Sequence, residues 1–136
     1  MPASFPAMIL AAGLGRRMRG FAPELPKPLV PVAGKPLFDY SLALLEHAGI
    51  KAAVVNTHYR AEQMEAHLAA CAKFAFQVSC EEDLLETGGG VAKALPHLAE
   101  RFFVLNSDVI CEDVTPPILT RLRDLWDDER MDALLL

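Results

Sequence analysis

Short apolar runs alternate with amphipathic segments along the chain, which is typical of buried strands that alternate with helices. The apolar runs predict strands at residues 7–12, 52–55, 74–80, 102–105 and 133–136. Apolar residues at helical spacing predict helices at residues 37–48 and 61–72, a third that starts after Gly90 and runs to about residue 98, and a fourth that begins at Pro116. We expect Thr115 to cap the fourth helix, since threonine favours the N-cap and proline the first helical position.

Five strands joined by four helical connections predict an α/β fold, a Rossmann-like parallel sheet with helices on both faces. The length of 136 residues suits one domain. The last predicted strand stops inside an apolar run, whereas domains usually end in exposed polar residues. We therefore expect residues 1–136 to be the front part of a longer protein.

The composition excludes several classes of protein. Hydrophobic residues make up 52% of the chain and charged residues 23%, which argues against a disordered chain. The longest uncharged stretch, residues 1–15, is broken by prolines and glycines and falls short of the ~20 apolar residues that a membrane span needs. No basic residue precedes the apolar run, so we expect neither a secretory signal nor a membrane partner.

Cysteine usage indicates a reducing compartment, and neither cysteines nor histidines indicate a metal site. Cys71, Cys80 and Cys111 form no C-x-x-C pair, which indicates free thiols rather than a disulfide framework or a zinc site. The four histidines show no metal-ligand spacing. We therefore expect a cytoplasmic protein without a metal bound by histidine or cysteine.

Charge is distributed unevenly along the chain. Residues 1–36 carry five basic residues and one acidic residue, whereas the remainder carries 8 basic and 17 acidic residues, and the net charge is −5. Such a chain is a poor general binder of nucleic acid, which needs a basic face. The basic segment fits either one small polyanion or an ordinary solvated loop.

The basic segment contains a glycine-rich turn that suits a phosphate ligand. Gly13, Gly15 and Arg17 follow the first predicted strand, and after eight intervening residues a Pro-Lys-Pro sequence places Lys27 between Pro26 and Pro28. Glycines let backbone N–H groups approach a phosphate, arginine offers a fork of donors, and the prolines fix the backbone around the lysine. Ligands bind at the carboxyl ends of strands in open α/β sheets, which is where this turn is expected to lie.

Two better-known phosphate loops are excluded. A dinucleotide fingerprint, G-x-G-x-x-G, needs glycine in place of Met18 and an acid at the end of the second strand, where Asn56 stands. A P-loop needs glycine in place of Leu29, and serine or threonine in place of Pro36 after Lys35. The Gly-x-Gly-x-Arg turn followed by Pro-Lys-Pro-Leu is a different kind of phosphate site.

Three segments together resemble the sugar-1-phosphate nucleotidyltransferases: residues 10–18 (LAAGLGRRM), residues 26–37 (PKPLVPVAGKPL) and residues 81–90, which contain LLETGGG. The third segment makes the chain most similar to the uridylyltransferases of N-acetylmuramate 1-phosphate and to the related guanylyltransferases of mannose 1-phosphate. The sequence Asn-Ser-Asp at residues 106–108 matches the metal-binding position of the family. The resemblance spans nearly the whole chain, although family members are longer and Gly-Phe-Ala at residues 20–22 replaces their more usual Pro-Leu-Thr.

The resemblance implies a nucleotidyltransferase fold and a role for each matched residue. Residues 1–136 would be the nucleotide-binding N-terminal part of a single domain. Arg17 and Lys27 are the implied catalytic residues: Arg17 would neutralise the β- and γ-phosphates of a nucleoside triphosphate, and Lys27 would bridge the α-phosphate and the sugar phosphate. Asp108 is the implied ligand of Mg²⁺, the expected cofactor. The implied nucleotide-binding residues are Ala11, Ala12, Gly13, Leu14, Gly15, Thr87, Gly88 and Asn106.

Neighbouring charged residues are expected to play lesser parts. Arg16 and Arg19 are expected to be solvated neighbours of the site. Glu86 is expected either to point away from the triphosphate or to meet a ribose hydroxyl or the sugar, because an acid beside phosphates is unfavourable.

The resemblance implies that a sugar 1-phosphate and a nucleoside triphosphate react and that pyrophosphate is released. UTP with N-acetylmuramate 1-phosphate, in a cell-wall recycling route, is the favoured pair of substrates. The alternative within this chemistry is GTP with a mannose- or heptose-type phosphate. An alternative of another class is a non-catalytic nucleotide-binding regulatory module. We expect no nucleic-acid partner, and the oligomeric state stays open.

Overall fold

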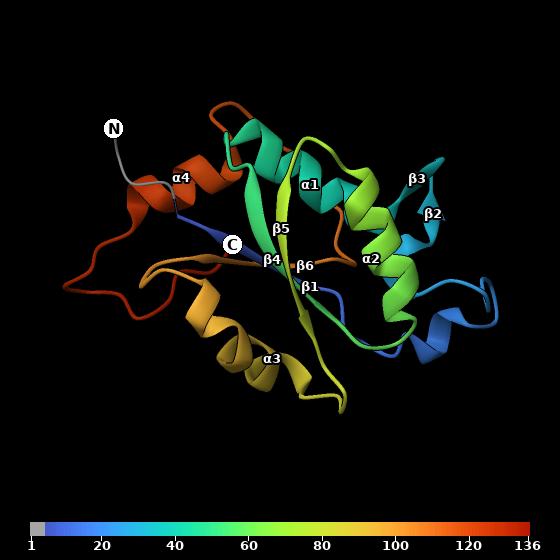
Figure 1. Cartoon of the computed structure of the whole chain (residues 1–136). Helices are drawn as coiled ribbons and strands as arrows, with labels where there is room; N and C mark the ends of the chain where they lie inside the picture. Colours follow the sequence, from blue (N-terminus) through green and yellow to red (C-terminus); the bar gives the residue numbers. More distant parts are fainter. Residues whose placement is uncertain (1–4) are drawn as a thin grey trace.

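The structure, a computed structural model, describes residues 5–136, and this part of the chain contains a 4-stranded parallel sheet. Figure 1 shows its strands in the order β5 (Ala75–Cys80), β4 (Ala52–Thr57), β1 (Ala7–Leu10) and β6 (Phe103–Asn106). Because all of them run in the same direction, their carboxyl ends lie together at one edge of the sheet. The predicted parallel sheet is confirmed.

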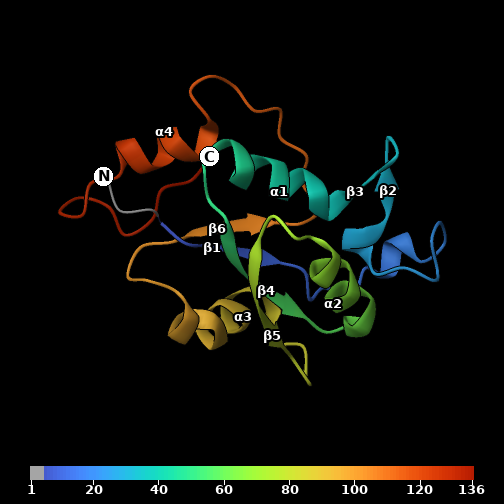
Figure 2. The same cartoon turned by 45° about the horizontal axis from the view of Figure 1, so that its top comes forward.

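Helices cover both faces of the sheet, as the sequence predicts. Figure 2 shows α1 (Leu37–His47), α2 (Ala61–Ala70) and α4 (Ile118–Leu125) on one face and α3 (Glu86–Ala94) alone on the other. A short 3₁₀ turn, Leu95–His97, follows α3. Between residues 5 and 136, no helix is both long enough and apolar enough to cross a membrane.

The connection from β1 to α1 contains local structure that hydrophobic periodicity does not predict. Arg16–Met18 and Lys27–Leu29 are single 3₁₀ turns, and β2 (Pro31–Val32) pairs antiparallel with β3 (Lys35–Pro36). Each of these features spans only two or three residues. Periodicity is read in windows of about 11 to 18 residues, so elements this short leave no signal.

Successive residues of β1 face opposite sides of the sheet, and both sides are buried. Ile9 packs among core residues of the face that α1, α2 and α4 cover, including Phe38 and Leu45. Met8 packs with Val54 of β4 and with Ala94 of α3. A parallel strand covered on both faces must be apolar at every position, which explains why residues 7–10 show no polar alternation.

The expected fifth strand at residues 133–136 is wrong. In the described chain these residues pair with no strand, and the side chains of Leu135 and Leu136 are 88% and 79% exposed. Ala133, Leu134 and Leu135 instead border an apolar hollow beside β6, which Phe103 and Trp126 also line. An apolar run favours burial, but a strand also needs a partner for its backbone hydrogen bonds, and here there is none.

The start of α4 also differs from the prediction. The helix begins at Ile118 rather than Pro116, and Thr115 does not cap it. Pro116 precedes another proline, which disfavours the helical conformation at residue 116. Asp113 supplies the acceptor instead: its Oδ1 atom accepts hydrogen bonds from the N–H groups of Ile118 at 2.8 Å and Val114 at 2.9 Å.

The Asp113 carboxyl has a lowered pKa as a result of these contacts. Burial alone would raise this pKa, but hydrogen bonds from the N–H groups of Ile118 and Val114 and from His47 outweigh it. A carboxyl group with a lowered folded-state pKa stabilises the fold above its unfolded pKa of about 4, and this stabilisation is lost as the pH falls through the folded pKa.

Replacing Asp113 by alanine should lower the free energy of unfolding by about 1 kcal/mol at neutral pH, because two backbone donors lose their acceptor. Urea unfolding of both proteins from pH 7 to pH 2.5 measures the difference, which should shrink with falling pH. Glu112→Ala, at the exposed neighbouring position, is the control and should have little effect. A difference that does not change with pH would contradict the capping role.

Candidate active site

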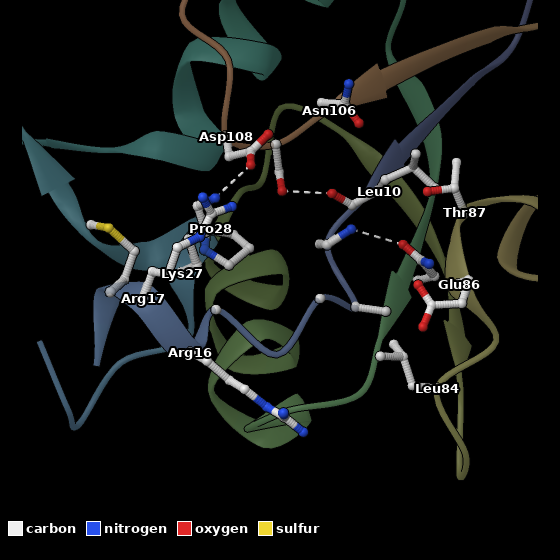
Figure 3. Close-up of a pocket in the computed structure, with 17 residues that line it drawn as sticks. Leu10, Arg16, Arg17, Lys27, Pro28, Leu84, Glu86, Thr87, Asn106 and Asp108 are labelled. Carbon is white, nitrogen blue, oxygen red and sulfur yellow. Dashed lines mark hydrogen bonds and ion pairs between the residues drawn. The ribbon is translucent and has the colours of Figure 1, made fainter. Parts of the chain in front are cut away.

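A cavity of about 330 Å³ opens where β1, β4 and β6 end, at the carboxyl edge of the sheet. This edge is the usual ligand site of open α/β folds. Figure 3 shows that basic residues and Asp108 form one side of the cavity, while the segment before and at the start of α3 forms the other. The cavity is lined by Leu10, Ala11, Ala12, Gly13, Gly15, Arg16, Arg17, Met18, Lys27, Pro28, Asn56, Leu84, Glu86, Thr87, Asn106, Ser107 and Asp108.

The glycine loop, residues 11–15, follows β1 directly and packs closely against Lys27 beside the cavity. Gly15 has a φ of 57°, and a Cβ atom there would lie 2.8 Å from Cβ of Lys27. Both the left-handed backbone and the close approach therefore require glycine at this position. Gly13 has no other atom within 4 Å of the place of a Cβ, so the backbone of Gly13 is open to the cavity that it lines.

The Pro-Lys-Pro sequence holds Lys27 in a stiff segment. Pro26 and Pro28 are both buried. Lys27 lies between them and is the first residue of the 3₁₀ turn Lys27–Leu29. Its Nζ atom lies 2.6 Å from Oδ2 of Asp108, 81 residues further along the chain (Figure 3). The two residues that the resemblance assigns to phosphate and to metal thus form an ion pair at the cavity.

The Lys27–Asp108 pair is accessible to solvent, with side-chain exposures of 30% and 39%. Pairs this exposed contribute about 0 to 1 kcal/mol, because water screens them and both side chains lose freedom. The pair therefore places the two charges without holding them strongly, and a charged ligand can separate them.

Of the two arginines expected to be solvated, Arg19 has different surroundings from those expected, whereas Arg16 is exposed as expected. Arg19 is partly buried: its Nη2 atom donates to the carbonyl of Leu14 at 3.2 Å, and its guanidinium lies 4.3 Å from the ring centre of Tyr59. The expectation of a solvated Arg19 is wrong, since this side chain supports the glycine loop. Arg16 is exposed and borders the cavity, but its side chain extends away from the Lys27–Asp108 pair in Figure 3.

The turn after β6 is fixed to the end of β1. The hydroxyl of Ser107 donates to the carbonyl of Leu10 at 2.6 Å, and the N–H of Ser107 donates to the same oxygen at 3.3 Å. Ser107 is buried, whereas Asn106 and Asp108 on either side of it are exposed at the cavity. The serine therefore determines where the aspartate emerges from the sheet.

Asn56, near the end of β4, and Glu81, just after β5, form a buried polar pair at the cavity, with exposures of 3% and 2%; Asn56 lines the cavity and Glu81 lies behind it. Oδ1 of Asn56 accepts from the N–H of Ala11 at 2.8 Å, and Nδ2 donates to Oε1 of Glu81 at 3.0 Å. Oε2 of Glu81 accepts from the N–H of Leu85 at 3.2 Å. Sequence reasoning assigned neither residue to the site; the available signal was a polar side chain at the carboxyl end of each apolar strand.

The start of α3 differs from the prediction, which placed it after the glycine run. α3 begins at Glu86, so the glycine run lies inside the helix instead of preceding it. A Cβ atom at Gly90 would lie 2.8 Å from both Asn56 Nδ2 and Glu81 Oε1, so only glycine lets the helix approach the buried pair. Glu86 itself has a φ of 61°, an uncommon conformation for a residue with a side chain.

Most residues that the resemblance singled out are brought together here. Arg17, Lys27, Ala11, Ala12, Gly13, Gly15, Thr87, Asn106 and Asp108 line the cavity, and their roles stay predictions. Leu14 and Gly88 are not among the lining residues. Leu14 faces the Arg19 contact through its carbonyl, and Gly88 is exposed on α3.

No group of three or more histidine, cysteine, aspartate or glutamate side chains in residues 5–136 could hold a metal ion. Asp108 and Glu86 are the carboxylates that line the cavity. A hard cation such as Mg²⁺ is commonly held by one or two carboxylates together with substrate phosphates and water. Asp108, with Glu86 as the other carboxylate of the cavity, therefore fits a divalent cation that takes its remaining ligands from phosphate oxygens and water.

Comparison with known proteins agrees with this geometry. Residues 7–136 match the family model of the MobA-like NTP transferase domain. The chain is 43% identical to N-acetylmuramate alpha-1-phosphate uridylyltransferase of Caulobacter vibrioides, over 96% of this chain and 56% of that protein. It is 44% identical to the catalytic subunit beta of mannose-1-phosphate guanylyltransferase of Drosophila melanogaster, over 78% of this chain and 30% of that protein.

A solved structure shows the same fold. HddC from Yersinia pseudotuberculosis, complexed with GMP-PN, superimposes with a TM-score of 0.72 at 27% identity, covering 87% of this chain and 54% of that chain. The chain thus spans about half the length of the uridylyltransferase and of HddC. These matches confirm the resemblance to sugar-1-phosphate nucleotidyltransferases that the three sequence segments indicated. Since the family model covers nearly all of the chain, the protein belongs to the MobA-like NTP transferase family.

Proposed function

We propose that the protein transfers a nucleotidyl group from a nucleoside triphosphate to a sugar 1-phosphate. The observation that carries this proposal is the meeting of Lys27 and Asp108 beside the glycine loop, at the carboxyl edge of the sheet. One cation for phosphate and one carboxylate for a metal, in a cavity floored by backbone, suit a reaction that needs positioning and charge neutralisation.

The favoured substrates are UTP and N-acetylmuramate 1-phosphate, which yield a UDP-sugar and pyrophosphate in a cell-wall recycling route. The support is the 43% identity to the Caulobacter uridylyltransferase, which covers nearly the whole chain. GTP with a mannose- or heptose-type phosphate is the second candidate, supported by the Drosophila guanylyltransferase subunit and by HddC complexed with GMP-PN. The three cysteines are free thiols, which fits a cytoplasmic enzyme.

In the proposed reaction, a phosphate oxygen of the sugar 1-phosphate attacks the α-phosphorus of the nucleoside triphosphate. The bond from this phosphorus to the oxygen that bridges to the β-phosphate breaks, and pyrophosphate leaves with the electron pair. The nucleophile is already an anion, because a phosphate monoester has a second pKa of about 6. The reaction therefore needs no general base from the chain.

The residues of the cavity would divide the charge between them. Lys27, held between buried prolines, would contact the α-phosphate and the sugar phosphate. Arg17, exposed at the cavity, would neutralise the departing β- and γ-phosphates. The backbone of Gly13 and Gly15 would donate to phosphate oxygens, and Thr87, on the α3 side, would contact the nucleoside.

Asp108 would hold Mg²⁺ once nucleotide phosphates separate it from Lys27. The bound cation would offset negative charge on the phosphates during transfer. Asp108 also positions Lys27 before the ligand arrives, through the 2.6 Å contact between the two side chains.

Replacing Lys27 by methionine in the complete protein should lower kcat by about 100-fold or more, the usual loss when a charge that stabilises the transition state is removed. Asp108→Ala should abolish turnover that depends on Mg²⁺. Pyrophosphate release measures both. Lys35→Met is the matched control, because Lys35 lies over the Tyr40 ring, outside the residues that line the cavity. Wild-type turnover in the Lys27 or Asp108 variant would contradict the assigned role.

Replacing Gly13 by alanine should weaken triphosphate binding by about tenfold or more, equivalent to ~1.4 kcal/mol, and leave the melting temperature unchanged. A Cβ at this position meets no protein atom, so only a ligand close to the backbone would sense it. Gly20→Ala is the control, since Gly20 also has open space but does not line the cavity. Equal affinities for the two variants would argue against backbone–phosphate contact.

Nucleotide choice is tested by thermal shift with UTP, GTP, CTP and TTP, each with Mg²⁺. A ligand at one hundred times its Kd should stabilise the fold by ~2.7 kcal/mol, which is readily visible. Selective stabilisation by UTP is the expected outcome. Selective stabilisation by GTP would support the guanylyltransferase alternative. No response to any nucleotide would contradict nucleotide binding by this chain.

A further inference from the structure

We propose that Asn56 and Glu81 are positioning residues that join the glycine loop to the start of α3, so that the phosphate and nucleoside parts of one nucleotide bind together. Through Ala11 the pair is bonded to the loop that lines one part of the cavity. Through Leu85 it is bonded to the segment that carries Glu86 and Thr87 across the cavity. The inference rests on the proposed function and deepens it.

The hydrogen-bonding capacity of the pair fits this task closely. The N–H of Ala11 can only donate, so the oxygen of Asn56 must face it, which turns the amide NH₂ toward Glu81. A carboxylate accepts on both oxygens, so Glu81 can receive Asn56 and the N–H of Leu85 at the same time. The orientation of one side chain thereby determines that of the next, from β1 to α3.

Burying the Glu81 carboxylate costs free energy of folding, so its presence calls for a reason other than stability. Glu81 is 2% exposed, and in the described chain no lysine, arginine or histidine forms an ion pair with it. A buried carboxylate is tolerated only when it is hydrogen-bonded, and apolar residues of similar volume often stabilise a core as well or better. Stability alone therefore gives little reason for an acid at this position.

The backbone of α3 closes over the same contact. Gly90 approaches so closely that an added Cβ would lie 2.8 Å from each of the two atoms that form the Asn56–Glu81 hydrogen bond. The helix is thus seated on the pair as well as bonded to it through Leu85. A displacement of Glu81 would reach Glu86 and Thr87 without passing through another side chain.

Glu81→Gln tests the proposal with almost no change in volume. A glutamine has one acceptor oxygen in place of two, so one of the three donors (Ala11, Asn56 or Leu85) loses its partner. Whichever donor loses its partner, the pair that holds both segments is loosened, so hydrogen exchange followed by NMR should be faster at the Ala11 amide as well as at the Leu85 amide. Faster exchange at Leu85 alone would overturn the claim that the pair links the two segments.

Binding provides the second readout, measured by calorimetry well below the melting temperature of each variant. In Glu81→Gln, affinity for UTP with Mg²⁺ should fall at least tenfold, while affinities for UMP and for inorganic tripolyphosphate should change less than threefold. This pattern is expected because each fragment needs one segment, whereas UTP needs both in register. Unchanged UTP affinity despite a lower melting temperature would reduce the pair to a structural role and overturn the proposal.

Two further variants keep the result interpretable. Gly90→Ala keeps both Asn56 and Glu81 in the sequence but places a Cβ atom against their contact, so it should reproduce the UTP defect if Glu81→Gln is poorly folded. Thr57→Val is the matched control: Thr57 is fully buried beside Asn56, and its hydroxyl has no hydrogen-bond partner in the described chain. It should bind all three ligands as the wild type does. A wild-type protein that binds no nucleoside triphosphate would instead refute the proposed function.

Discussion

The hydrogen bond from the N–H of Ala11 to Asn56 is the contact on which the rest of the cavity depends. β1 ends at Leu10, so the next residue leaves the sheet and needs an acceptor from elsewhere. Asn56 supplies it from β4, while Ser107, after β6, holds the carbonyl of Leu10 on the other side. The exit direction of the chain is thereby fixed from both neighbouring strands, and the glycine loop and the basic turns follow from it.

The Lys27–Asp108 ion pair is weak enough for a charged ligand to replace it. Lys27 and Asp108 neutralise each other across 2.6 Å while both remain partly exposed. On the proposed function, a nucleotide that brings a cation would offer the lysine an anion and the aspartate a metal, so one weak ion pair would be replaced by two stronger contacts. A ligand that supplies only one of the two charges leaves the other residue without its partner. On that function, the cavity would favour a metal–phosphate complex over either component.

The sequence predicted the parallel sheet and its helices because short apolar runs such as β4 alternate with amphipathic segments such as α1. It predicted the basic side of the cavity because glycine, arginine and proline restrict local geometry within a few residues. It did not predict Asn56 and Glu81, which lie 25 residues apart and act only once β4 and β5 are paired. It placed the start of α3 too late because glycines read as a break, whereas Gly90 lies in the helix to allow a close approach.

The uneven covering of the sheet gives the two sides of the cavity different stiffness. The face beneath α1, α2 and α4 holds a large buried core. On the other face, in the described chain, Ala94 of α3 packs over Met8 and Val54, with only partly buried residues around them. The basic side is therefore built on a rigid base, and the α3 side on a thinner one. A ligand that spans the cavity would reduce the motion of α3 most, and part of its binding free energy would be spent on ordering that helix.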